Sequence, residues 1–230
     1  ASRHCFQGRC ACSAAPAPAL ASAGGGGLAY LEKNGWLAEA KLRNFIVVAP
    51  DGLPARPGEP ANFLTNPGVW NAGNLRAGTP RARLDDVAFV TAMLDDAERR
   101  WRVLPGRIFV TGHSNGGALA FLLAARLGRR IAAIAPVASL PGPELRKVVP
   151  PVPTMYFLGR LDPLVPYAGG RSVLPWGTRL TEAVEPAISR WSQALGCGVR
   201  PAATRLEKGV ERRKYCGLFE VVLIEGQGHG

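Results

Sequence analysis

RIFVTGHSNGGALAFLLAARLG, residues 107–128, changes character in its middle. It begins as a short apolar run rich in β-branched residues and continues as an alanine- and leucine-rich stretch with helical periodicity. Gly112 and Gly116 stand two positions either side of Ser114, where the strand pattern gives way to the helix pattern. A sharp strand-to-helix turn brings backbone segments very close, so the positions two before and two after its centre need to be nearly free of side chain. We therefore predict a tight turn that presents Ser114.

The rest of the chain alternates between strand-like and helix-like segments. Continuously apolar strands that alternate with helices are typical of a parallel sheet with helices on both faces, and ligands bind such sheets at the carboxyl ends of the strands. We predict one Pro- and Gly-rich loop at 53–80, helices at 28–43, 85–102, 115–128 and 181–195, and strands at 45–50, 107–111, 131–137, 153–158 and 219–224.

The first part of the chain differs from the rest. Residues 1–27 are rich in Ala, Pro, Gly and Ser and have no strand or helix period, so we expect an irregular, disordered leader. Residues 28–230 are enough for one sizeable core, and we expect a single α/β domain there. No basic start followed by an apolar segment is present, so we expect no signal peptide in this chain. No apolar run approaches the ~20 residues that span a bilayer, and we expect no membrane partner.

The formal net charge of +11 raises the possibility of a nucleic-acid partner. Arginine supplies 23 of the 28 basic residues, scattered in ones and twos, and no basic run is longer than ERRK at 211–214. Nucleic-acid surfaces gather basic residues on one face or interleave them with aromatic side chains. We therefore interpret the charge as a solvated surface and expect no nucleic-acid partner.

The five cysteines fall into two groups. Cys197 and Cys216 bracket a hairpin-sized segment and could form one disulfide, which would suit an exported protein. The early group, in CFQGRCAC, lacks a second ligand pair at any structural-zinc spacing. We expect no metal site.

A serine hydroxyl becomes a nucleophile only when a base accepts its proton, and histidine is the usual base. The chain has three histidines. His4 lies in the leader, and His113, adjacent to Ser114 on a tight turn, must point its side chain elsewhere. His229 follows the apolar run FEVVLI in the loop EGQGHG. It could be a solvated residue near a chain end, but the turn at Ser114 favours it as the base.

The imidazole of such a base needs a carboxylate that fixes its tautomer. Between Ser114 and His229 the chain has several glutamates but one aspartate, Asp162, directly after the strand-like segment PTMYFLG. Asp162 could be a simple Asp-Pro turn residue. The chain order Ser, Asp, His is that of α/β-hydrolases.

Several motifs between residues 24 and 230 carry a resemblance to a known family. They are NGW at 34–36, FIVVAPDG at 45–52, WNAG at 70–73, DDVAFV at 85–90, VTGHSNGGALA at 110–120, IAAIAPVAS at 131–139, GRLDPLVPY at 159–167, ISRWSQALGC at 188–197 and IEGQGHG at 224–230. The chain resembles the polyhydroxybutyrate depolymerase-like and feruloyl-esterase-like α/β-hydrolases, which are secreted bacterial esterases. The resemblance implies Ser114 as nucleophile, Asp162 as acid, His229 as base, secretion, no cofactor, and ester substrates such as short polyesters or feruloyl and acetyl esters.

Two departures from the family concern the oxyanion hole and the chain end. The amide of Asn115, at the expected helix start, supplies one donor. Family members supply the other after a first strand that ends in His-Gly, whereas this chain has LASAGGGG at 20–27, where we assign the donor to Gly25. The family also continues past the catalytic histidine, while this chain stops at Gly230. The second hypothesis is therefore a catalytically impaired hydrolase-fold protein, either a binding module or a truncated gene product.

The short spacing between Ser114 and Asp162 leaves little room for a cap domain, so we expect an open active site. We also expect a monomer. Four loop residues are candidates to line it: Trp70, Asn71, Tyr167 and Trp176. The aromatic ones could equally fill gaps beneath a long loop.

Overall fold

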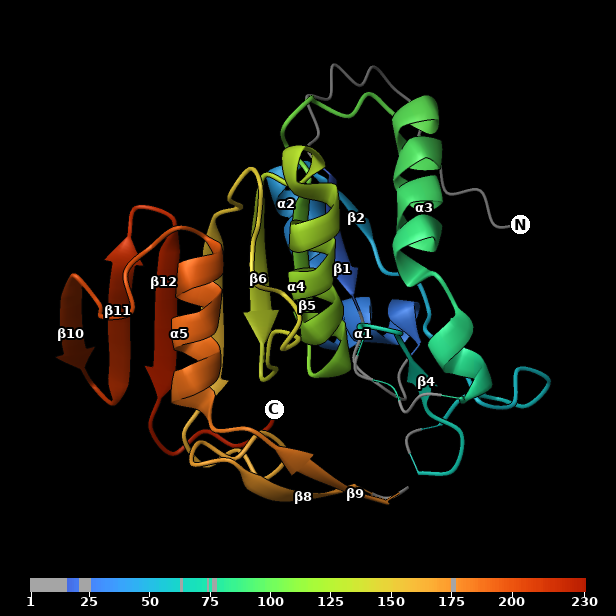
Figure 1. Ribbon diagram of the computed structural model, residues 1–230. Helices are drawn as coiled ribbons and strands as arrows, with labels where there is room; N and C mark the ends of the chain where they lie inside the picture. The colour runs from blue at the N-terminus through green and yellow to red at the C-terminus, as the bar shows by residue number, and fades with distance from the viewer. Residues whose placement is uncertain (1–15, 21–25, 63, 74, 76–77, 175–176) are drawn as a thin grey trace.

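A single eight-stranded sheet organises the protein (Figure 1). The computed structural model describes residues 16–20, 26–62, 64–73, 75, 78–174 and 177–230. The strands of the sheet, in chain order, are β1 (Pro16–Leu20), β2 (Ile46–Val48), β5 (Phe109–His113), β6 (Ala133–Val137), β7 (Thr154–Gly159), β10 (Ala203–Glu207), β11 (Val210–Cys216) and β12 (Phe219–Ile224).

The strand order across the sheet is β10-β11-β12-β7-β6-β5-β1-β2. Pairing is parallel from β12 to β2 and antiparallel in the β10-β11-β12 edge. Because neighbouring parallel strands end on the same side, β5, β7 and β12 bring the segments that follow them to one edge of the sheet. The predicted mostly parallel α/β architecture is confirmed.

Helices lie on both faces of the sheet, as predicted: α4 and α5 lie in front of it in Figure 1, and α2 lies behind it. The helices are α1 (Gly27–Lys33), α2 (Trp36–Arg43), α3 (Asp86–Arg100), α4 (Asn115–Leu127) and α5 (Val184–Ala194), with 3-10 turns η1 (Pro80–Arg83) and η2 (Gly128–Arg130). Asp85 caps α3 by accepting a hydrogen bond from the amide of Ala88.

The predicted helix at 28–43 is in fact two helices. Gly35 adopts a left-handed conformation, with φ 72°, between α1 and α2. This conformation, which glycine adopts without a steric cost, ends one helix and allows the next to start in a new direction.

The expectation of an irregular leader is wrong for residues 16–20. They form β1, which lies between β2 and β5 in the eight-stranded sheet. Pro16 and Pro18 lie in the half of β1 that pairs with β2, and Ala19 and Leu20 in the half that pairs with β5. Proline has no N–H to donate to a neighbouring strand, so prolines in a sequence argue against a central strand. For this reason the sequence pattern did not predict β1. The other residues of 1–25 lie outside the described part of the chain.

Three short hairpins complete the fold. The predicted loop at 53–80 contains β3 (Leu53–Pro54) and β4 (Gly68–Val69), and a second hairpin, β8 (Gly170–Leu174) with β9 (Gly177–Thr181), precedes α5. The third, β10 with β11, follows Cys197 and ends at Cys216. Cys197 and Cys216 form a disulfide, with Cα atoms 5.8 Å apart, which confirms that pairing.

The core lies between α4, α5 and the sheet. Phe121 of α4 packs edge-on against Tyr156 of β7 and Trp191 of α5, with ring centroids 5.1 and 4.7 Å away. All three side chains are fully buried. Burial of large aromatic surfaces stabilises this layer and fixes α4 against the strands, and so fixes the turn that starts α4.

Candidate active site

Ser114 stands at the predicted strand-to-helix turn, between β5 and α4. Its backbone has φ 54° and ψ −119°, a conformation that a residue with a side chain rarely adopts. A Cβ atom on Gly112 would lie 2.4 Å from the carbonyl carbon of Gly116, so the chain can make this turn only with glycine at position 112. The turn predicted from the spacing of the glycines is confirmed.

The three residues predicted as a triad meet at the carboxyl edge of the sheet. Nε2 of His229 lies 2.9 Å from Oγ of Ser114, and Nδ1 lies 2.8 Å from Oδ2 and 3.0 Å from Oδ1 of Asp162. The Asp162 side chain is fully buried, while the His229 side chain is 19% exposed. An imidazole so placed can accept a proton from the hydroxyl while the carboxylate holds the proton on Nδ1.

The loops that carry Asp162 and His229 pack directly against each other. The amide of Leu161 donates to the carbonyl of Gln227 at 3.0 Å. A Cβ atom on Gly159 would lie 2.3 Å from that same carbonyl oxygen, so glycine at the end of β7 is what allows the approach. This contact fixes the acid loop relative to the base loop.

Hydrogen bonds keep Asp162 ionised despite its burial. Burial alone would raise the pKa of this carboxyl, but the hydrogen bond with His229 and those from the amides of Val165 and Leu164, both 2.8 Å, outweigh it. The pKa of Asp162 is therefore lowered. A charged, fixed acceptor is what the tautomer of His229 requires.

The lowered pKa of Asp162 predicts an acid-dependent loss of stability. The unfolded carboxyl, with its pKa near 3.8, takes up a proton before the folded one does. The stabilisation is therefore complete well above that value and is lost as the pH falls towards the lower folded pKa. Urea unfolding between about pH 3 and pH 6 should show a steeper fall in the free energy of unfolding for the wild type than for Asp162→Asn. Parallel pH dependences for the two proteins would contradict this expectation.

The two predicted oxyanion donors have different outcomes. Asn115 is the first residue of α4, so its N–H has no carbonyl one turn earlier to bind and is directed beyond the helix start. Its role as a donor remains a prediction. Gly25 lies outside the described residues.

The side chain of Asn115 has a contact that the sequence did not reveal. Its Oδ1 accepts a hydrogen bond from the amide of Trp70 at 2.6 Å, and its Nδ2 donates to the carbonyl of Trp70 at 3.0 Å. This pair of bonds ties the segment after β4 to the residue that follows Ser114. No local signal could have shown it, because the partners are 45 positions apart.

Asn115→Ala is expected to lower the free energy of unfolding by about 1–3 kcal/mol, because the partly buried N–H and C=O of Trp70 lose their partner. Urea denaturation at neutral pH measures the change. Asn34→Ala is the matched control, since the Asn34 side chain makes one exposed hydrogen bond, to the carbonyl of Tyr30, and its loss should cost less than about 0.5 kcal/mol. Equal losses in the free energy of unfolding for the two substitutions would show that the bonds to Trp70 stabilise the protein no more than one exposed hydrogen bond does.

The described residues that we expected to line an open site pack against, or hydrogen-bond with, other parts of the protein. Trp70 is 2% exposed and stacks on Phe89, so its ring fills space beneath the loop and the expectation that it lines the site is wrong. The side-chain NH₂ group of Asn71 donates to two backbone carbonyls, that of Ala82 in η1 and that of Leu84 at the C-terminal end of η1. The Tyr167 hydroxyl donates to Glu185, and its ring lies under the Arg160 guanidinium. Trp176 lies outside the described residues.

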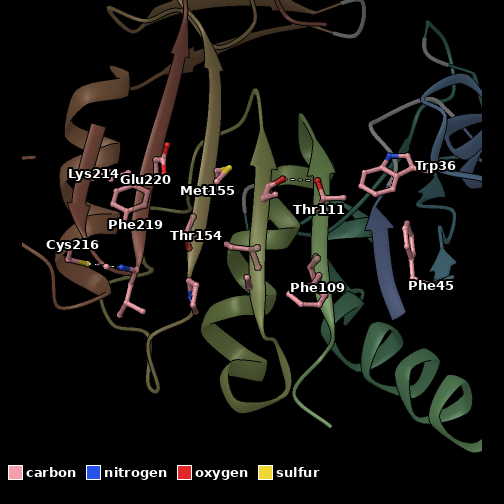
Figure 2. A pocket seen from close by; sticks show the side chains of 17 residues that line it. Trp36, Phe45, Phe109, Thr111, Thr154, Met155, Lys214, Cys216, Phe219 and Glu220 are labelled. Carbon is pink, nitrogen blue, oxygen red and sulfur yellow. Dashed lines mark hydrogen bonds between the residues drawn. The ribbon is translucent and has the colours of Figure 1, made fainter. Parts of the chain in front are cut away.

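A large apolar groove lies at the opposite end of the strands from Ser114. Figure 2 shows Trp36 and Phe45 on one side of it and Cys216 and Phe219 on the other. Its floor comes from the starts of β5, β6, β7 and β12, at Phe109, Ala133, Thr154 and Phe219. The groove therefore belongs to a different edge of the sheet from the three polar residues.

The described residues also bear on a metal site and on a membrane-spanning helix. In those parts of the chain, no three His, Cys, Asp or Glu side chains are arranged to hold a metal ion. None of the helices described there is long and apolar enough to cross a membrane.

The sequence relatives of this chain are named as esterases. Feruloyl esterase B of Piromyces equi is 28% identical over 208 residues, which is 86% of this chain. The chain spans 36% of the length of that relative. No family model matches the chain.

Solved structures agree on the fold. The acetyl xylan esterase from Aspergillus awamori matches with a TM-score of 0.67 and 14% identity, covering 95% of this chain and 85% of the other. Esterase PE8 matches with a TM-score of 0.59 and 18% identity, covering 95% and 86%. Together with the parallel sheet and the tight turn at Ser114, these likenesses show that the chain has the α/β-hydrolase fold.

Proposed function

We propose that the protein is a serine carboxylesterase in which Ser114, His229 and Asp162 form the catalytic triad. The observation that carries the proposal is the continuous line of contacts from Asp162 through His229 to the Ser114 hydroxyl, at 2.8 and 2.9 Å. The three groups come from segments far apart in the chain, and each stands in the loop that follows a strand of one sheet. This arrangement is that of a Ser-His-Asp triad, in which the serine is the nucleophile of acyl transfer.

In the proposed reaction the Ser114 Oγ forms a bond to the ester carbonyl carbon as His229 Nε2 takes the hydroxyl proton. The oxyanion accepts a hydrogen bond from the Asn115 amide. The bond to the leaving alcohol then breaks, and the alcohol takes the proton from His229, leaving an acyl-enzyme. Water then attacks the carbonyl carbon of the acyl-enzyme as His229 takes one of its protons. The bond to Ser114 Oγ breaks, Oγ takes that proton from His229, and the acid leaves. Asp162 stabilises the imidazolium formed in both halves.

For the substrate we propose feruloyl or acetyl esters, with short polyesters such as polyhydroxybutyrate as the other class of ester. One sequence relative is named feruloyl esterase B, which supports the first class. We also propose that the protein works outside the cytoplasm, because the Cys197–Cys216 disulfide persists in an oxidising compartment.

The purified chain tests the proposal with methyl ferulate, acetylated xylan and a hydroxybutyrate oligomer, followed by labelling with a fluorophosphonate. We expect turnover of at least one ester and one phosphonate adduct, located by mass spectrometry on Ser114. The buried serines Ser172 and Ser192 are internal controls and should stay unlabelled. Absence of both turnover and adduct would refute the esterase and leave a hydrolase-fold binding module. The relative rates on the three substrates decide between the ester classes.

A further inference from the structure

His113, the last residue of β5, directs its side chain to the loop that carries His229. Its Nε2 is in hydrogen-bond contact with the backbone carbonyl oxygen of His229. The two imidazole rings pack edge to face, with centroids 4.8 Å apart and planes at 63°. The expectation that His113 points away from the serine is correct, and the structure identifies what it contacts instead.

The contact fixes the protonation of His113. A carbonyl oxygen can only accept, so Nε2 of His113 must carry a hydrogen and act as the donor. Burial lowers the pKa of His113, and the nearby His229 ring lowers it further, while the bond to the His229 carbonyl and the charge of Asp162 act in the opposite direction. At neutral pH His113 is therefore a neutral donor. It can stand beside an imidazolium at position 229 without opposing the positive charge.

The backbone of His229 has few other attachments. Among the described residues, only the His113 side chain makes a hydrogen bond to the main chain of His229. The ring of His229 is held separately, by Asp162 at Nδ1. These two attachments, one at the ring and one at the backbone, act on His229 itself, in addition to the bond between Leu161 and Gln227 at the start of its loop. A displacement of about 1 Å at a reacting group can cost about 100-fold in rate, so an attachment of the His229 backbone bears on catalysis.

We propose that His113 is a positioning residue for ester hydrolysis, holding the backbone of His229 through its Nε2–H so that the base stays within reach of Ser114. The proposal rests on the proposed function of the triad. It assigns His113 no contact with the substrate and no proton transfer.

Two substitutions at position 113 separate hydrogen bonding from packing. His113→Phe keeps a ring but removes the donor, and His113→Gln keeps an N–H donor without the ring. We expect His113→Phe to lower kcat by about 10- to 100-fold, the scale of a displacement near 1 Å at a reacting group, with KM changed less than about twofold. His113→Gln should recover most of kcat. The rate of phosphonate labelling at Ser114 should follow kcat in both variants.

Thr111→Val is the matched control, because Thr111 lies on the same strand and its hydroxyl donates to the carbonyl of Ala135 at 2.7 Å. It removes one side-chain bond to a backbone carbonyl and should leave kcat within about twofold of the wild type. A wild-type kcat in His113→Phe would overturn the proposal, and so would a His113→Gln variant no faster than His113→Phe at equal thermal stability. If the wild type itself neither hydrolyses esters nor labels at Ser114, it is the triad assignment that fails.

Discussion

Ser114→Ala is expected to lower kcat for ester hydrolysis by about 10⁴- to 10⁶-fold, the loss seen when a serine-protease triad loses its nucleophile. The hydroxyl is the atom that forms the acyl-enzyme, and no other hydroxyl is seen in contact with His229 Nε2 among the described residues. A small rate above that of water is expected to remain, because the Asn115 amide can still bind the developing oxyanion. Steady-state turnover of methyl ferulate or a short acyl ester measures the change.

Ser189→Ala is the matched control for this variant. Ser189 lies in the middle of α5, in none of the contacts of the triad, and alanine is favourable in a helix. It should turn over esters at the wild-type rate. Retained activity in pure, folded Ser114→Ala would remove the nucleophile assignment while leaving the fold unaffected.

The second large effect concerns the acid. Asp162→Asn is expected to lower kcat by about 10⁴-fold with little change in KM. Oδ1 of Asp162 already accepts the amides of Leu164 and Val165, so the asparagine carbonyl would keep that side and its NH₂ group would face His229 Nδ1. An NH₂ group there favours the tautomer with its proton on Nε2, which cannot accept the proton of Ser114. A pre-steady-state burst assay and steady-state rates measure the loss.

Asp96→Asn is the control, because Asp96 is an exposed carboxylate on α3 that pairs with Arg99 and Arg100. It should keep wild-type kinetics. A near wild-type rate in Asp162→Asn would mean that another carboxylate orients His229. The glutamates between Ser114 and His229 are poorly placed for that role, since Glu185 pairs with Arg213 and Glu207 lies on the exposed edge strand β10.

Sequence patterns located most of the sheet and its central turn because these depend on local rules. Continuous apolar runs gave β5, β7 and β12 within two residues of their ends, and the glycines around Ser114 gave the turn. The same rules failed for β1, because Pro16 and Pro18 have weak strand character of their own and the strand exists through its pairing with β2 and β5. They also missed β10, whose five residues are all exposed and so show no alternation.

The candidate site divides in the same way. Residue type, chain order and position after a strand were enough to select Ser114, Asp162 and His229, because chemistry restricts which side chains can serve. The Asn115 contact with Trp70, the His113 contact with His229, and the burial of Trp70 depended on partners distant in sequence. The sequence by itself thus determined which groups are available for catalysis, since that follows from residue types and local backbone geometry. Only the tertiary structure decided how those groups are held, because the hydrogen bonds that hold them join segments that become neighbours only when the sheet forms.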